Sequence, residues 1–416
     1  MLPKLYERYQ VAGQNSWLSM GRVLLLVLVG ISLSVLGLIS AAMFPVLPAL
    51  LSVLVVFVFF GSKRTSALGA VLMLCLFLGW MNGEKSISGD WGWYTIHHKL
   101  LSYMSIWDYL GSQFGNIKIK TSEPVFHFIS YALANITGGD PVVLAWVVTF
   151  LIYGLCGLAL AVLLDSVADN SIEIVAAVLA ALAVGITFTL TTQLVRQEIA
   201  TAFIVLGFVT WTCDRRNLGF FLIALGVLTH NSSIIPVGVV AVAIYFARMP
   251  EEVRAKRLVL VLPVFILLGF AFVRLAGGGG YYTIGKSDGA IAWYVHVFDL
   301  VVFMAFAFLY RRITTPEVRF FCVALLISWL MYVSFLVGTY SEPLPFLRMY
   351  FYMESMRMLM IAVSVLILVK IVPYVLSVPV MLVMAVLYVE ARLMTSPFWY
   401  KGGVIMHFIR PFAFFN

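Results

Sequence analysis

The chain is a succession of long apolar segments separated by short polar ones, and this pattern constrains its fold more than any other feature. Hydrophobic residues make up 62% of the 416 residues and charged residues 11%, whereas a soluble domain is about half apolar and about a quarter charged. Many apolar runs approach the ~20 residues that a membrane helix requires, and the alternating pattern of barrel strands is absent. The sequence therefore predicts an all-α polytopic membrane protein, with residues 1–416 forming one integral membrane domain.

Thirteen segments are candidate membrane spans, so about 12–13 transmembrane helices are expected. They cover residues 23–43, 46–61, 66–82, 141–164, 174–193, 197–213, 218–230, 232–247, 258–276, 293–310, 318–338, 353–370 and 374–393. The stretch 218–247 is too long for one ordinary span, and we expect it to break at the sequence THNSS. In this break, residues 231–233 supply the turn and a candidate N-cap for the second half.

The basic residues favour one orientation of these spans. With the N-terminus in the cytoplasm, a break near His230 places every strong basic cluster inside, as the positive-inside rule requires. The net charge of +8 is therefore spread over short clusters between spans, and we expect no nucleic-acid partner. The two longest polar segments, residues 83–140 and the glycine-rich 277–292, are then expected to be outer, periplasmic loops.

The outer segment 83–140 is rich in Trp and Tyr, which favour the membrane–water interface. Tyr94, His98, Leu101 and Met104 share one face at helical spacing. A second short helix is predicted in EPVFHFISYALANI, with Pro124 near its start. We expect these amphipathic helices to lie along the membrane surface and to cover a cavity.

The four cysteines lie in apolar segments without CxxC spacing or neighbouring histidines. This placement predicts buried, unreactive thiols, with neither a disulfide nor a zinc site. They are Cys75, Cys156, Cys213 and Cys322.

Arg196 is the most informative single residue, because it interrupts the apolar stretch LTTQLVRQEIATAFIVLGF. A charged residue at the centre of a membrane helix costs roughly 2.5–3.5 kcal/mol, and by default it marks a functional site. Gln197 and Glu198 follow it, and a helix that begins here would direct its positive dipole end at an anion. The alternatives are an arginine that snorkels to the outer head groups or one that pairs with a carboxylate such as Glu198.

His230, Arg274 and Arg348 also fall at the outer ends of their spans. His230 lies at the helix break, where it is either an acid–base group or a packing histidine. Arg348, close to Tyr350, is a candidate ligand for an anion, whereas Arg274 either binds the anion or snorkels to the interface.

Three further charged residues have both a functional and a structural interpretation. Arg357 either binds substrate or is neutralised by Glu354, three residues before it. Asp90 and Glu123 are outer-loop carboxylates, which either take part in the site or are simply solvated.

Several arginines beneath a cover of Trp and Tyr suit a lipid-linked phosphate or pyrophosphate. Arginine binds phosphate oxygens with a planar fork and stays charged. No paired-aspartate motif such as DxD stands in an outer loop. The sequence therefore predicts chemistry without a metal or other cofactor, in which arginines stabilise the leaving group.

Four short motifs resemble the EpsG-like and Wzy-type polysaccharide polymerase family: SEPVFHFIS, LVRQEIA, THNSSIIP and FLRMYFYM, in this order. The resemblance implies a GT-C-like, all-helical glycosyltransferase of the bacterial inner membrane with a periplasmic active site. The implied partners are an undecaprenyl-pyrophosphate-linked oligosaccharide, membrane lipids and a chain-length regulator. The matching motif residues are Arg196, His230, Arg348 and Glu123.

The resulting hypothesis is that the protein is an oligosaccharide repeat-unit polymerase. The predicted catalytic residues are Arg196, His230 and Asp90, and the predicted substrate-binding residues are Arg348, Gln197, Glu123, Arg274, Tyr350 and Arg357. The alternatives are a flippase for the same lipid-linked unit, an O-antigen ligase and a scaffolding membrane protein. A flippase is expected to place basic residues deep in a central cavity rather than at one face.

Overall fold

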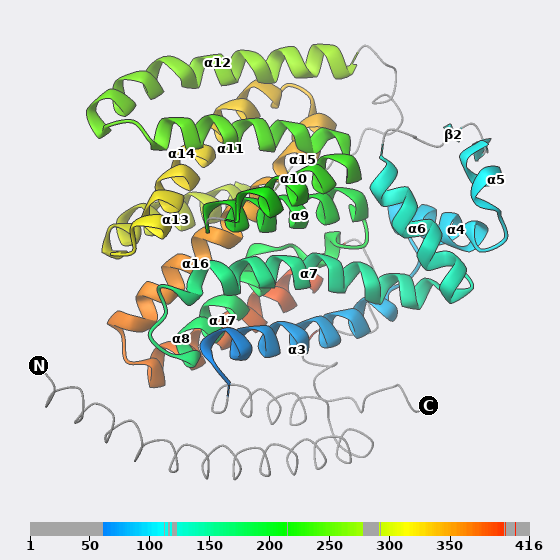
Figure 1. Ribbon diagram of the computed structural model, residues 1–416, viewed down its shortest axis with the longest axis horizontal. Coiled ribbons are helices and arrows are strands. Elements are labelled where there is room, and N and C mark those ends of the chain that lie inside the picture. The colour runs from blue at the N-terminus through cyan, green and yellow to red at the C-terminus, as the bar shows by residue number, and fades with distance from the viewer. Residues whose placement is uncertain are drawn as a thin grey trace, which may run out of the picture.

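The computed structural model describes residues 61–111, 123–213, 215–277 and 293–394, together with 113, 114, 117, 118, 291, 396 and 404. In this part of the chain, long helices lie side by side, and shorter ones gather at one end of the bundle (Figure 1). The predicted span 23–43 lies outside the described residues, as do the span 46–61 apart from Gly61 and the loop 277–292 apart from Gly277 and Ile291.

Each of the eleven other predicted spans corresponds to a helix. Seven helical segments in the described residues are long and apolar enough to cross a membrane. These are α3 (Lys63–Gly83), α7 (Pro141–Asp165), α12 (Glu251–Gly277), α13 (Trp293–Leu309, continuing to Arg312 in a short 3-10 turn), α14 (Pro316–Thr339), α15 and α16 (Pro343–Tyr350 and Met353–Ile371) and α17 (Tyr374–Met394). The four others are α8 (Ser171–Gly185), α9 (Val195–Thr212), α10 (Arg216–Thr229) and α11 (Ile234–Ala247). The prediction of a polytopic helical membrane protein is thus confirmed, and seven of the eleven predicted spans in the described residues have the length and composition of a full span.

The segment α15–α16 lies at the centre of the bundle, since 83% of an apolar 18-residue stretch within it is buried. Only 17% of the corresponding stretch is buried in each of α12, α13 and α17, so most of the surface of these three helices is not covered by protein. Gly269 on α12 and Gly338 on α14 mark a close helix crossing. A Cβ at Gly338 would lie 2.1 Å from the Ile266 carbonyl oxygen, so only glycine permits this approach.

The helix that begins at Ser171 ends at Gly185, although the apolar run predicts a span to residue 193. Residues 186–194 instead form an irregular, largely buried segment containing the 3-10 turn η1 (Phe188–Leu190). Irregular backbone is tolerated at membrane depth where other protein groups form hydrogen bonds with its N–H and C=O groups. Here the Glu354 carboxylate accepts hydrogen bonds from the Thr187 backbone N–H at 2.8 Å and the Thr187 hydroxyl at 2.5 Å.

The predicted break near His230 is confirmed. Helix α10 ends at Thr229, His230 is extended, and the 3-10 turn η2 (Asn231–Ser233) leads into α11. Ser233 occupies the N-cap position of α11, as predicted, but its side chain makes no capping hydrogen bond. The Ser233 hydroxyl instead donates back to the His230 carbonyl at 2.6 Å.

Two lysines tie together one end of the bundle, which we call the basic end. Lys63 donates to the carbonyls of Asp165 and Ala168 at 2.8 and 2.6 Å. Lys370 forms an ion pair with Asp169 at 2.8 Å. The loop after α7, which has no basic residue of its own, thus receives its positive charge from two other segments.

The opposite end, which we call the site end, carries the predicted outer segment (Figure 1). This segment contains α4 (Asp90–Leu101), α5 (Ile106–Gly111), the two-residue strands β1 (Gln113–Phe114) and β2 (Ile117–Lys118), and α6 (Pro124–Thr137). The strands pair antiparallel, with Gln113 opposite Lys118. Pro124 begins α6 as predicted, whereas Met104 lies beyond the end of α4 and cannot share its face.

Three of the four cysteines are buried free thiols, as predicted. Cys213 is exposed, which contradicts the prediction. The reason is its position just after the last turn of α9, where the apolar span ends.

Candidate functional site

The first turn of α9 directs three consecutive polar side chains to three different parts of the protein. Arg196 forms an ion pair with Glu123 at 2.5 Å, and not with Glu198. Gln197 donates to the Arg348 carbonyl at 2.8 Å. Glu198 is buried and lies in the electrostatic neighbourhood of Glu354 and Arg357. This turn therefore connects the outer segment, the end of α15 and the buried centre of the bundle.

Glu123 joins two residues that are far apart in the sequence. One carboxylate oxygen accepts from the Arg196 guanidinium, and the other accepts from Nδ1 of His230 at 2.7 Å. Glu123 precedes α6, and only 1% of its surface is exposed. Three residues predicted from separate motifs thus form one hydrogen-bonded group, which we call the triad.

The charge state of Glu123 is set by its two partners. Burial alone would raise the pKa of this carboxyl, but the hydrogen bond from His230 and the positive charge of Arg196 outweigh burial and lower its pKa to about 2. An ionised carboxylate can only accept hydrogen bonds. A ring proton of His230 must therefore lie on Nδ1, and Nε2 makes no hydrogen bond to a described residue.

Both partners of Glu123 keep polar atoms that are not engaged within the triad. The His230 side chain is 19% exposed and the Arg196 side chain 28% exposed. Arg196 also donates through Nε to the Tyr94 hydroxyl at 3.3 Å, so its second terminal nitrogen makes no hydrogen bond to a described residue. The triad thus leaves an imidazole nitrogen of His230 and a guanidinium nitrogen of Arg196 without a hydrogen bond to a described residue.

Aromatic side chains from α4 and α6 cover the triad. Tyr94 packs edge-on against Phe126, with ring centroids 5.9 Å apart, and the Arg196 guanidinium lies 6.0 Å from the Phe126 ring centre. His97, one turn beyond Tyr94, is partly buried beside His127. Burial, followed by the positive potential of His127 and Arg196, lowers the pKa of His97 to about 4, so this histidine is neutral at physiological pH.

Asp90 stands at the first position of α4 and is exposed. Helical spacing places it one turn before Tyr94, on the same face. The Asp90 backbone N–H donates to Oε1 of Gln193 at 2.9 Å, and Gln193 also donates to the Ser88 carbonyl. Sequence reasoning missed Gln193, although it is a polar residue in the same interrupted stretch as Arg196.

The predicted arginines occupy different environments. Arg348 is exposed near the end of α15, and its side chain makes no hydrogen bond or ion pair with a described residue. Its backbone is nevertheless fixed beside the triad by Gln197. Arg274 is exposed in the last turn of α12, and the structure shows no contact between it and the triad among the described residues.

Arg357 and Tyr350 belong to a separate buried network. Arg357 pairs with Asp299 at 2.9 Å and with Glu354 at 3.4 Å, and it donates to the Gly185 carbonyl at 3.0 Å. Tyr350 donates its hydroxyl proton to Asp299. The predicted pair with Glu354 is therefore present. Asp299 was missed, although a single aspartate in the apolar run WYVHVFDLVVF is a signal that could have identified it.

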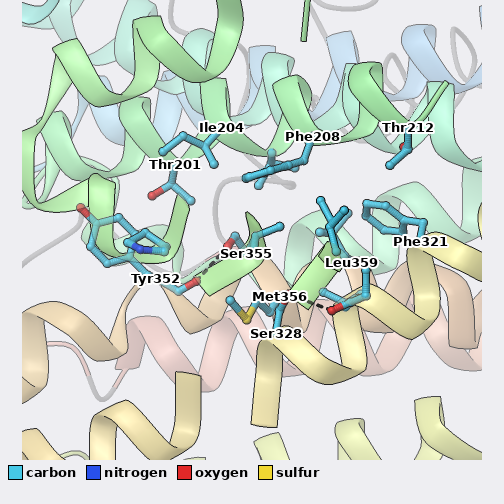
Figure 2. A pocket seen from close by; sticks show the side chains of 16 residues that line it. Thr201, Ile204, Phe208, Thr212, Phe321, Ser328, Tyr352, Ser355, Met356 and Leu359 are labelled. Carbon is cyan, nitrogen blue, oxygen red and sulfur yellow. Dashed lines mark hydrogen bonds between the residues drawn. The ribbon is translucent and has the colours of Figure 1, made fainter. Parts of the chain in front are cut away.

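A narrow apolar pocket lies among α9, α11, α14 and α16 (Figure 2). Thr201 and Tyr352 lie at one end of it, and Thr212 and Phe321 at the other (Figure 2). The Tyr352 hydroxyl is 2.8 Å from that of Ser232, two residues after His230. The pocket is therefore connected to the triad through Tyr352, but no charged residue lines it.

Comparison with known proteins agrees with the motifs in the triad. A family model described as the EpsG family matches residues 68–401, a range that contains every residue of the triad and of the buried network. No curated protein and no solved structure matches the chain. Because the family model covers most of the sequence, the protein belongs to the EpsG family, a family of the Wzy-type polysaccharide polymerase kind.

Proposed function

We propose that the protein is a GT-C-like glycosyltransferase that joins undecaprenyl-pyrophosphate-linked repeat units at the periplasmic face of the inner membrane. The observation that carries this proposal is the Glu123 carboxylate, which holds Arg196 and His230 in one group. A base beside a fixed cation is the arrangement that transfer of a sugar from a pyrophosphate requires. Family membership supports the polymerase class.

The proposed reaction is a single displacement at the donor sugar. Nε2 of His230 takes the proton of an acceptor hydroxyl, whose oxygen forms a bond to the anomeric carbon of the donor chain. The bond from that carbon to the pyrophosphate oxygen breaks, and undecaprenyl pyrophosphate leaves with the electron pair. Arg196 and Arg348 stabilise the developing negative charge. The Glu123 carboxylate stabilises the imidazolium that His230 becomes.

Glu123 itself is a poor base for this reaction. Both of its oxygens are engaged, and a pKa of about 2 leaves it little tendency to accept a proton. We therefore assign the proton transfer to His230 and give Glu123 the role of positioning it. Asp90, exposed one turn from Tyr94, is proposed to orient the acceptor hydroxyl.

The two alternative functions, an O-antigen ligase and a flippase, are distinguished from a polymerase by whether a glycosidic bond forms and to which acceptor. A ligase uses the same donor but transfers it to lipid A core, and a flippase forms no bond. The gathering of Arg196, His230 and Arg348 at the site end favours an enzyme over a transporter, since a transporter places its charges in a cavity reached from both sides.

Purified protein in liposomes with undecaprenyl-pyrophosphate-linked repeat units and lipid A core, followed by sizing of the products, tests this assignment. We expect a ladder of products from the wild type and only single repeat units from His230→Gln. The matched control is Arg311→Gln. Arg311 is exposed in the 3-10 turn that follows α13, and we expect this variant to give the wild-type ladder. A single transfer to lipid A core, or no transfer by the wild type, would contradict the polymerase assignment.

A further inference from the structure

A groove separate from the triad lies between α13, α14 and the α15–α16 segment. It has a volume of about 440 Å³, which lies within the ~300–1,000 Å³ range typical of ligand sites. The pocket in Figure 2 offers about 50 Å³, which is too little for a ligand of any length. Its lining includes His296, Asp299 and Leu300 of α13, Val337 of α14, and Phe346 and Tyr350 of α15.

The lining of the groove suits a hydrocarbon chain. Asp299 is its only charged residue, and both carboxylate oxygens of Asp299 are taken by Arg357 and Tyr350. The remaining lining is mainly aliphatic and aromatic, and His296 packs its ring edge-on against Tyr350 at 5.3 Å. The groove therefore offers apolar contact without an unpaired charge.

The position of the groove indicates that its occupant comes from the membrane. It opens beside α13, a helix with only 17% of its apolar window buried. Leu300 and Val337 are 51% and 54% exposed. Along α14 the lining runs from Trp329 to Tyr340, which at 1.5 Å per residue is about 16 Å, or roughly half of the ~30 Å hydrocarbon thickness. The groove thus has the depth of one leaflet, on the side of the site end.

Helix α15 connects this groove to the triad. Phe346 and Tyr350 line the groove from one face of the helix. Arg348, two residues from each, lies on the opposite face, is exposed and has no partner among the described residues. The Arg348 carbonyl is bound by Gln197, the neighbour of Arg196. A lipid whose chain occupies the groove would therefore have its head group at α15, next to cations that bind phosphate.

We propose that this groove binds the prenyl chain of undecaprenyl pyrophosphate, with the diphosphate at Arg348. This inference rests on the proposed function and names the part of the protein that holds the carrier lipid. An ordinary phospholipid would fill the groove equally well with its chains, but its single phosphate has fewer oxygens to offer the arginines than a diphosphate has.

The experiment measures binding of undecaprenyl pyrophosphate, without any sugar, to the full-length protein in nanodiscs of phosphatidylcholine. Leu300→Trp fills the groove. Val301→Trp is the matched control, because Val301 is the next residue of α13, is 58% exposed and does not line the groove. We expect Leu300→Trp to weaken binding by about tenfold or more through lost apolar contact, and Val301→Trp to change it less than about twofold. Excess phosphatidylglycerol should not displace the carrier.

Wild-type affinity in Leu300→Trp would overturn the proposal, and so would displacement of the carrier by phosphatidylglycerol. Val337→Trp fills the groove from α14, so a folding defect in one variant leaves the test intact. Because the assay contains no repeat unit, it tests binding of the carrier lipid in the groove independently of the proposed polymerase activity. Carrier binding in the groove by a protein that forms no polymer contradicts the proposed function alone, whereas polymerisation with unchanged carrier affinity in both variants contradicts the groove alone.

Discussion

Replacing Glu123 by glutamine removes one negative charge from a buried carboxyl that serves two partners. Both partners donate to it, Arg196 through a guanidinium nitrogen and His230 through Nδ1. Glutamine keeps the shape but has one acceptor oxygen and one NH₂ group. Its NH₂ must therefore face one of these donors, so at least one hydrogen bond is lost and the guanidinium loses its counter-charge.

The size of this effect follows from the pKa of Glu123. Its pKa is lowered from 4.5 to about 2 in the folded protein, and each pKa unit corresponds to ~1.36 kcal/mol. The ionised form is therefore favoured by about 3 kcal/mol. Because the folded pKa lies below the unfolded one, this contribution is fully present above pH 4.5 and is lost as the pH falls through about 2.

Chemical denaturation of the detergent-solubilised protein measures the loss. At pH 7 we expect Glu123→Gln to be less stable than the wild type by about 3 kcal/mol, and we expect the gap to narrow between pH 4.5 and pH 3. The polymerisation rate should fall by about 10²–10⁴, because the imidazole of His230 is no longer held in one tautomer. Glu342→Gln is the control, because it removes the same charge from an exposed residue at the start of α15.

Three results would refute this reasoning. One is a Glu123→Gln variant with wild-type stability at pH 7, and another is a stability gap that widens as the pH falls from 4.5 to 3. The third is an unchanged rate in a destabilised variant, which would show that the triad holds the fold together without taking part in the reaction.

Further predictions concern the cation of the triad, the buried network and the helix crossing. Arg196→Lys should lose most polymer length on a sizing gel, because an ammonium group cannot contact the carboxylate and a phosphate with a planar fork, whereas Arg311→Lys should give normal lengths. Asp299→Asn should lower the unfolding free energy by about 3–5 kcal/mol, because it leaves a buried guanidinium without one of its counter-charges; an unchanged denaturation midpoint would contradict this. Gly338→Ala should lower the melting temperature, since its Cβ would meet a backbone oxygen at 2.1 Å, whereas Gly154→Ala, with nothing within 4 Å, should not.

The sequence predicted most of the helices because the length of an apolar run limits what can cross a membrane. It also located the break at His230 through the distribution of basic clusters, which is a property of the whole chain. The errors lie where local contacts decide the outcome. The helix after Ser171 stops at Gly185 because Glu354, far away in the sequence, satisfies the backbone of Thr187. Apolar periodicity carries no information about such a contact.

The topology deduced from the sequence was also sufficient to place Arg196, His230 and Arg348 at one end of the bundle. Which residues pair there was decided only by the tertiary structure. Glu123 meets Arg196 across 73 residues and His230 across 107, and these contacts depend on how α6 docks against α9 and α10. Likewise, Asp299 reaches Arg357 only because α13 packs on α16. Hydropathy determines which segments enter the membrane, but the order in which helices pack determines which buried charges neutralise each other.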